Sequence, residues 1–72
     1  MNIMKGAKMY PGITREMKKR GLKIRELAVV LKVSEWRMYN LLSGRSTFTK
    51  LEREALAEFF EINEEELFGK EA

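Results

Sequence analysis

Apolar residues recur with a helical period along most of the chain. In residues 24–31, for example, Ile24, Leu27, Ala28 and Leu31 fall at i, i+3, i+4 and i+7, which makes one apolar stripe on a helix. Strict alternation of apolar and polar residues, typical of a strand, is not found. The pattern predicts helices over about 12–20, 24–31, 35–43 and 50–60, with a short fifth helix after Asn63. The expected fold is therefore all-α, a compact five-helix domain over residues 12–69 after a flexible arm of residues 1–11.

Residues that favour helix ends stand at the borders of these segments. Gly21 and Gly44 are placed to end two helices in the left-handed conformation. Ser34 is a good N-cap for the third helix. Two pairs, Thr49 with Glu52 and Asn63 with Glu66, have the spacing of a capping box. Inward positions in the last two helices are expected to be Leu51, Ala55, Leu56, Phe59, Phe60, Leu67 and Phe68.

The third expected helix has an unusual outer face. Met38, Leu41 and Leu42 point to one side at 100° per residue, toward the core. The opposite side carries Trp36, Tyr39, Asn40 and Ser43, and Glu35 and Arg37 flank the tryptophan. Aromatic, amide and guanidinium groups on an outer face indicate a binding surface.

Composition limits the chemistry that this chain can perform. It has 72 residues, with no cysteine and no histidine, so thiolate metal sites and histidine general bases are excluded. We therefore expect no enzyme activity, no catalytic residues, no cofactor and no metal. The run of glutamates at 64–66 suits the first turn of a helix better than a metal site. No apolar run approaches a membrane span, and the N-terminus lacks the apolar core of a secretion signal, so a cytoplasmic location without membrane contact is expected.

Charge is distributed unevenly along the chain. The net charge is +3, but residues 1–50 hold 12 of the 14 lysines and arginines and three of the 11 acidic residues, which gives +9. Residues 51–72 carry the remainder, a net charge of −6. Such asymmetry favours a polyanionic partner for the basic part, although an uneven solvated surface would look the same.

Residues 21–44, "GLKIRELAVVLKVSEWRMYNLLSG", resemble the helix-turn-helix of the lambda-repressor-like family, also called the XRE or Cro/CI family. The family pattern "GxSxxELAxxLGVSxxxISxIxxG" aligns without a gap, and the segment from Phe48 to Phe68 resembles the family's ending. Matching positions are Glu26, Leu27, Ala28, Leu31, Val33, Ser34, Leu41 and Gly44, with Met38 in place of isoleucine. The likeness covers about residues 13–68 and is greatest to small regulators of phages and other mobile elements.

Three positions depart from the family pattern. Lys32 stands where the family prefers glycine in the turn, at a cost of roughly 1 kcal/mol if that residue is left-handed. Ile24 stands where many members carry a glutamine that binds a backbone phosphate. Lys23 replaces the usual serine or threonine N-cap, which loses a cap but adds a cation.

The resemblance implies a transcriptional regulator that binds duplex DNA, with helix 35–43 in the major groove. It would act as a Cro-type or repressor-type homodimer on an inverted-repeat operator and occlude a promoter, with no small-molecule ligand. Base contacts would come from Glu35, Trp36, Arg37, Tyr39 and Asn40. Phosphate contacts would come from Lys23, Arg25, Ser43, Arg45, Ser46, Thr47 and Lys50. The dimer interface would be formed by Phe59, Phe60, Ile62, Leu67 and Phe68.

Other interpretations stay open at this point. Trp36 could fold over Lys32 or Tyr39 as a surface lid, or could bind a protein partner, since tryptophan is favoured at such sites. The apolar residues near the C-terminus could simply pack in the core. The same fold also serves antitoxin-like or accessory regulators and protein-interaction modules.

Overall fold

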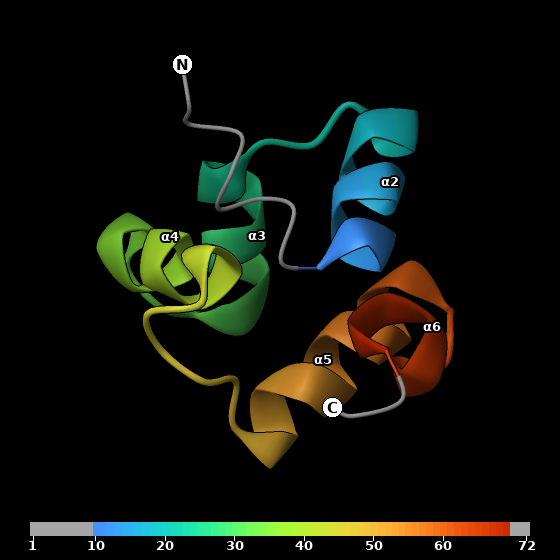
Figure 1. The fold of residues 1–72 in the computed structure, drawn as a ribbon. Helices are drawn as coiled ribbons and strands as arrows, with labels where there is room; N and C mark the ends of the chain where they lie inside the picture. The colour runs from blue at the N-terminus through green and yellow to red at the C-terminus, as the bar shows by residue number, and fades with distance from the viewer. Residues whose placement is uncertain (1–9, 70–72) are drawn as a thin grey trace.

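In a computed structural model of the chain, residues 10–69 are described, and they form five α-helices connected by short turns (Figure 1). No strand occurs in this part of the chain. The helices are α2 (Pro11–Arg20), α3 (Ile24–Leu31), α4 (Glu35–Ser43), α5 (Lys50–Phe60) and α6 (Glu64–Phe68). The expected all-α fold with five helices is therefore confirmed. None of these helices has the length and apolar character that a membrane crossing requires.

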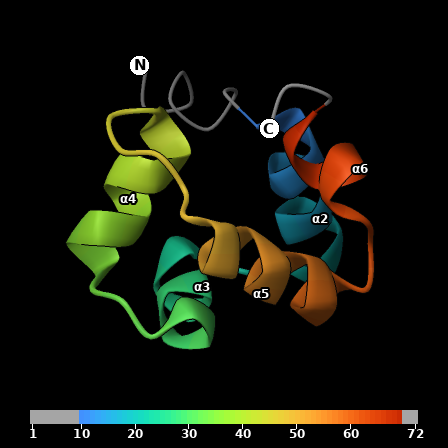
Figure 2. The ribbon, with the colours of Figure 1, turned by 90° about the horizontal axis from the view of Figure 1, so that it is seen from below.

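The helices enclose one apolar core. α3 packs against both α4 and α5, while α6 packs against α2 and α5. Seen from below, α4 lies at one side of the molecule and α2 with α6 at the other, with α3 and α5 between them (Figure 2). The radius of gyration is 11.0 Å, close to the value of about 11 Å expected for a folded chain of this length. The buried apolar residues are Ile13, Leu27, Ala28, Met38, Leu41, Leu42, Phe48, Leu56, Phe60 and Leu67.

Most helix ends form as the sequence predicts. Gly21 and Gly44 end α2 and α4 with φ values of 66° and 86°. The Ser34 hydroxyl accepts a hydrogen bond from the Arg37 N–H at 3.0 Å, and Thr49 and Glu52 form a reciprocal capping box. At α6 only half of the expected capping box forms. The Asn63 side chain accepts a hydrogen bond from the Glu66 N–H, but the Glu66 side chain does not accept one from the Asn63 N–H.

Two helices end on a left-handed residue that is not glycine. Lys32 ends α3 with φ 60°, and Glu61 ends α5 with φ 61°. In both cases the next residue, Val33 or Ile62, donates its N–H back to a carbonyl in the last turn of the helix. Lys32 adopts this left-handed conformation at a cost of roughly 1 kcal/mol.

The N-terminal boundary differs from the expected one. α2 begins at Pro11, within the segment assigned to the arm, because proline presets φ for the first helical position. Tyr10 also belongs to the packed domain, since its ring meets Phe48 and Phe68 edge-to-face at 5.3 and 5.7 Å. The rest of the proposed arm, residues 1–9, lies outside the described residues.

Three apolar residues lie elsewhere than expected. Leu51 and Phe59 were predicted to be buried by α5, but they are 76% and 41% exposed. Phe48, which was assigned to a loop, is buried and completes the aromatic cluster with Tyr10 and Phe68. Helical periodicity could not reveal its burial, because Phe48 precedes α5 and belongs to no helix.

Arg20, which pairs with a buried carboxylate, ties α2 to the end of α5. Glu16 is only 4% exposed and pairs with Arg20 at 3.3 Å. Arg20 in turn donates a hydrogen bond to the Phe60 carbonyl at 2.9 Å, and its guanidinium lies 4.8 Å from the centre of the Phe60 ring. The charge of Glu16 is therefore compensated where it is buried, and Arg20 occupies a carbonyl at the C-terminus of α5.

Gly12 allows α2 and α6 to approach closely. A Cβ atom at this position would overlap the Glu66 carbonyl oxygen and would lie 2.9 Å from the Cα atom of Leu67. Both atoms belong to the backbone, so they cannot move aside without displacing α6. The first turn of α2 is thus packed directly against the main chain of α6.

We expect Gly12→Ala to destabilise the fold by about 1–3 kcal/mol, the usual cost of overpacking a close contact. Alanine favours a helix over glycine by up to about 1 kcal/mol, so a net loss requires that the clash outweighs this gain. Urea unfolding followed by circular dichroism measures the change. Arg15→Ala, at an exposed position of the same helix, is the control and should alter stability little. A Gly12→Ala variant as stable as the wild type would contradict the close packing.

Candidate functional site

The connection between α3 and α4 consists of residues 32–34 only. Lys32 turns the chain in its left-handed conformation, and the Val33 N–H bonds to the Ala28 carbonyl at 3.0 Å. Ser34 then caps α4 at once. Because every residue of this turn is held by the backbone or by a cap, α4 has a defined orientation on α3.

The two faces of α4 agree with the sequence prediction. Met38 and Leu41 are fully buried, and Leu42 is nearly so. On the outer face Trp36 is 67% exposed and Tyr39 is 37% exposed. Their rings stack, with centroids 6.3 Å apart and planes inclined by 22°. Trp36 thus meets Tyr39, as the surface-lid interpretation expected, yet most of its indole remains open to solvent.

An open hollow lies between the N-terminal turns of α3 and α4. Its lining consists of Lys23, Ile24, Arg25, Glu35, Trp36 and Tyr39. The two aromatic rings and Ile24 supply apolar surface, and two cations and one carboxylate stand with them. The structure therefore brings together three of the five expected base-contact residues and two of the expected phosphate-contact residues.

The N-terminus of α3 is capped in part by Glu26, because the side chain of the N-cap residue Lys23 cannot cap it. A lysine side chain has no acceptor for the free N–H groups of a helix. Glu26 compensates, because its carboxylate accepts the Lys23 N–H at 2.7 Å. The start of α3 is thereby fixed while the ammonium group of Lys23, an exposed residue, stays available at the hollow.

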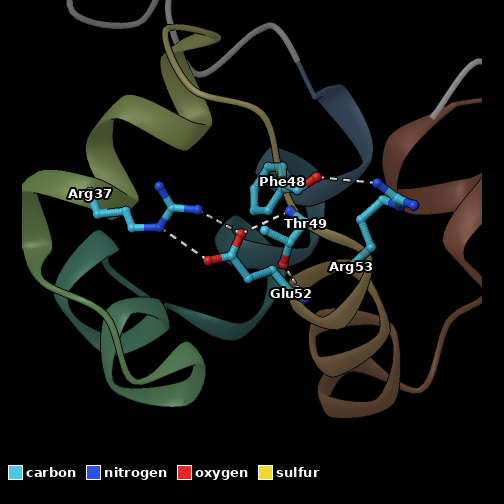
Figure 3. Close-up of polar contacts among 5 residues, drawn as sticks. All are labelled: Arg37, Phe48, Thr49, Glu52 and Arg53. Carbon is cyan, nitrogen blue, oxygen red and sulfur yellow. Dashed lines mark hydrogen bonds and ion pairs between the residues drawn. The ribbon is translucent and has the colours of Figure 1, made fainter.

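Arg37 is engaged with α5 rather than free on the outer face. Its Nε and Nη2 atoms donate to the two carboxylate oxygens of Glu52 at 3.1 and 3.0 Å (Figure 3). Glu52 is 13% exposed at its side chain, and the same carboxylate accepts the Thr49 N–H at 2.9 Å. Arg37 thus joins the first turn of α4 to the first turn of α5.

Arg53 of α5 forms a second ion pair, which connects α5 to α6. Arg53 donates to the Phe48 carbonyl at 3.2 Å, as Figure 3 shows, and to Glu64 at 3.3 Å. It therefore fixes the loop that carries Phe48 and the start of α6. No group of three acidic side chains placed to hold a metal ion occurs in residues 10–69.

Asn40 is held at the C-terminal part of α4. Its backbone carbonyl accepts the N–H groups of Arg45 and Ser46 at 2.9 and 3.1 Å and the Ser43 hydroxyl at 3.2 Å. Its side-chain Oδ1 atom is buried and has no hydrogen-bond partner. The amide therefore does not point freely outward, as the sequence had suggested.

The remaining phosphate-contact candidates follow α4 along the chain. Arg45, Thr47 and Lys50 are exposed, whereas Ser43 and Ser46 are half-buried. The Ser43 hydroxyl already donates its proton to the Asn40 carbonyl. Exposed cations are therefore present along the connection from α4 to α5. The side chains of Ser43 and Ser46 are less accessible to a ligand.

The expected dimer residues divide into two groups. Phe60 and Leu67 are each 1% exposed in the single chain, so their bulk belongs to its own core and offers no surface to a second copy. Ile62 and Phe68 are half-buried against the same core. Only Phe59 is exposed, at 41%. Simple packing thus accounts for most of the apolar residues at this end of the chain.

Two residues with a part in the site were not predicted as such. Glu52 was recognised only as a cap residue, and no local signal indicates that it also binds Arg37, which lies 15 positions earlier. Ile24 lines the hollow although the sequence suggested only packing.

Comparison of the chain with known protein families, with characterised proteins and with solved structures gives no match to any of them.

We expect the Arg37–Glu52 pair to contribute a coupling energy of about 1 kcal/mol, in the range of a partly exposed bidentate ion pair. A double-mutant cycle of Arg37→Met, Glu52→Gln and the double variant, read by urea unfolding, measures it. Glutamine at position 52 can still accept the Thr49 N–H, so the cycle isolates the pair from the cap. The coupling should fall as salt is added. Additive effects of the two substitutions would show that the contact contributes nothing to stability.

Proposed function

We propose that this protein binds duplex DNA through α3 and α4, which act together as a helix-turn-helix, and that it regulates transcription. The observation that carries the proposal is the hollow at the N-terminal turns of these helices, where Lys23 and Arg25 stand beside the exposed ring of Trp36. Cations and an exposed aromatic ring on one rigid helix pair suit a ligand with charged phosphates and apolar base edges.

The position of α4 and the charges around it support this proposal. The major groove of B-DNA admits one α-helix, and α4 lies at one side of the molecule (Figure 2), with Trp36 67% exposed on its outer face. Lys23 and Arg25 flank the hollow from α3, and Arg45 and Lys50 are exposed beyond the end of α4. In the proposed complex these cations contact the phosphates on both sides of the groove, which fixes the register of α4.

Sequence resemblance is a separate argument for the same role. The turn at residues 32–34 has the length of the family's turn, and Lys32 takes the left-handed conformation in which the family prefers glycine. The uneven charge also agrees, because the acidic residues that follow position 51 lie mainly on α5 and α6. Duplex DNA would then meet the exposed cations Lys23, Arg25, Arg45 and Lys50 rather than the acidic side chains of α6.

We further propose a homodimer as the DNA-bound form, with promoter occlusion as its mode of action. Of the residues first considered for the interface, Phe59 retains the exposed apolar surface that such a contact needs, and Leu51 on the same helix adds to the apolar surface of α5. A twofold dimer would place two α4 helices about 34 Å apart, one turn of the duplex.

A protein-interaction module is the second candidate. The same exposed Phe59 and Leu51 favour it, since they lie on a helix with three glutamates, an amphipathic character that suits a protein partner. In that case the working surface would be α5, and the cations beside α4 would be a solvated surface without a specific ligand.

Selection of bound sites from a random duplex library, at two salt concentrations, tests the proposal. An enriched inverted repeat with half-sites about 10 base pairs apart is the expected result for a dimer. A monomer would enrich one half-site. Weak binding without an enriched sequence would contradict the proposed DNA binding and favour the protein-interaction module.

We expect Arg25→Gln to weaken binding to the selected site and to make the negative slope of log K against log salt shallower by about 1, the loss of one phosphate contact. Arg15→Gln is the matched control, because it removes the same charge from an exposed position of α2, on the side of the molecule opposite α4 (Figure 2). Fluorescence anisotropy at several salt concentrations measures both. Equal effects of the two variants would mean that net charge, and not the position of Arg25, governs binding.

A further inference from the structure

The two side chains of α4 best suited to reading purines are both engaged inside the protein. A guanine is usually read by a forked arginine contact, and an adenine by an amide that both accepts and donates. Arg37 uses Nε and Nη2 on Glu52, and Asn40 has its Oδ1 atom buried. Turning the Asn40 amide about its last bond would only exchange the buried oxygen for nitrogen, so one of its two polar ends stays covered either way.

The groups that remain open on α4 have a different chemistry. Trp36 is 67% exposed, and its ring stacks on Tyr39, so together they offer a broad apolar surface. Ile24 adds further apolar surface to the same hollow. Glu35 is exposed and can only accept hydrogen bonds while it is ionised. In the major groove, the apolar group on a base edge is the C5-methyl of thymine.

We propose that the site reads thymine methyl groups through the Trp36–Tyr39 surface and that it does not read purine edges through Arg37 or Asn40. The inference rests on the proposed binding of duplex DNA and names the feature of the DNA that gives sequence preference. A thymine methyl enters the hollow against Trp36, while Lys23 and Arg25 hold the neighbouring phosphates. Arg37 keeps its bond to Glu52 in the complex, where its Nη1 atom, which has no partner among residues 10–69, is left for a phosphate.

Base analogues in the selected duplex test this inference. Deoxyuridine in place of thymidine removes only the C5-methyl group, and 7-deazaguanine or 7-deazaadenine removes the N7 acceptor of a purine. We expect each critical thymine to lose about fourfold in affinity as uracil, the contribution of one buried methyl group. Each 7-deazapurine should leave the affinity within about twofold of the unmodified site, since no bidentate purine contact is lost.

A cycle of protein and DNA variants assigns the methyl contact to one residue. In Trp36→Ala the uracil substitution should have no further effect, because the surface that meets the methyl is gone. Arg25→Gln is the matched control: it weakens binding through a phosphate, so the fourfold uracil effect should persist in it. Circular dichroism is the check that each variant keeps its helices, which is the expected result because both positions are exposed.

The outcomes separate this inference from the proposal on which it depends. If no site can be selected from the random library, DNA binding itself fails and the inference fails with it. If a site is selected and 7-deazapurines cost more than uracil, Arg37 or Asn40 reads purines and the inference is overturned. It is overturned equally if the uracil effect is unchanged in Trp36→Ala. A uracil effect that is present in the wild type and in Arg25→Gln, but absent in Trp36→Ala, supports it.

Discussion

The carboxylate of Glu52 links the first turns of two consecutive helices, α4 and α5. It accepts the Thr49 N–H at the start of α5 and the fork of Arg37 in the first turn of α4. Arg37 is itself fixed by Ser34, whose hydroxyl accepts its backbone N–H. The cap of α4, the cap of α5 and the ion pair therefore involve the same four residues, Ser34, Arg37, Thr49 and Glu52. Together they fix the orientation of α4 relative to α5 and both ends of the loop between them.

This contact also decides which side chains are available on the outer face of α4. With Arg37 drawn toward α5, the surface that remains is dominated by Trp36 and Tyr39, which stack over the hollow. The guanidinium of Arg37 thus contributes to the structure, and the rings of Trp36 and Tyr39 remain exposed. A site of this kind would gain affinity from phosphate contacts and preference from apolar contact, with few hydrogen bonds to bases.

Local features of the fold could be read from the sequence, whereas contacts between distant segments could not. Most helix ranges, the left-handed ends at Gly21 and Gly44 and the buried face of α4 depend on spacing and cap chemistry, and they were predicted correctly. The burial of Phe48 and the exposure of Leu51 depend on how α5 is placed in three dimensions. The same holds for the partner of Arg37 and the buried oxygen of Asn40, which lie within the candidate site.

In the proposed function, the outer face at the start of α3 and α4 meets duplex DNA. An NMR titration of the labelled protein with a mixed-sequence duplex tests it most directly, because Trp36 is the only tryptophan and gives one indole resonance. We expect this resonance and the amides of Lys23, Arg25 and Tyr39 to shift first, while those of α6 stay in place. Shifts confined to α5 and α6, or no shifts at low salt, would contradict it.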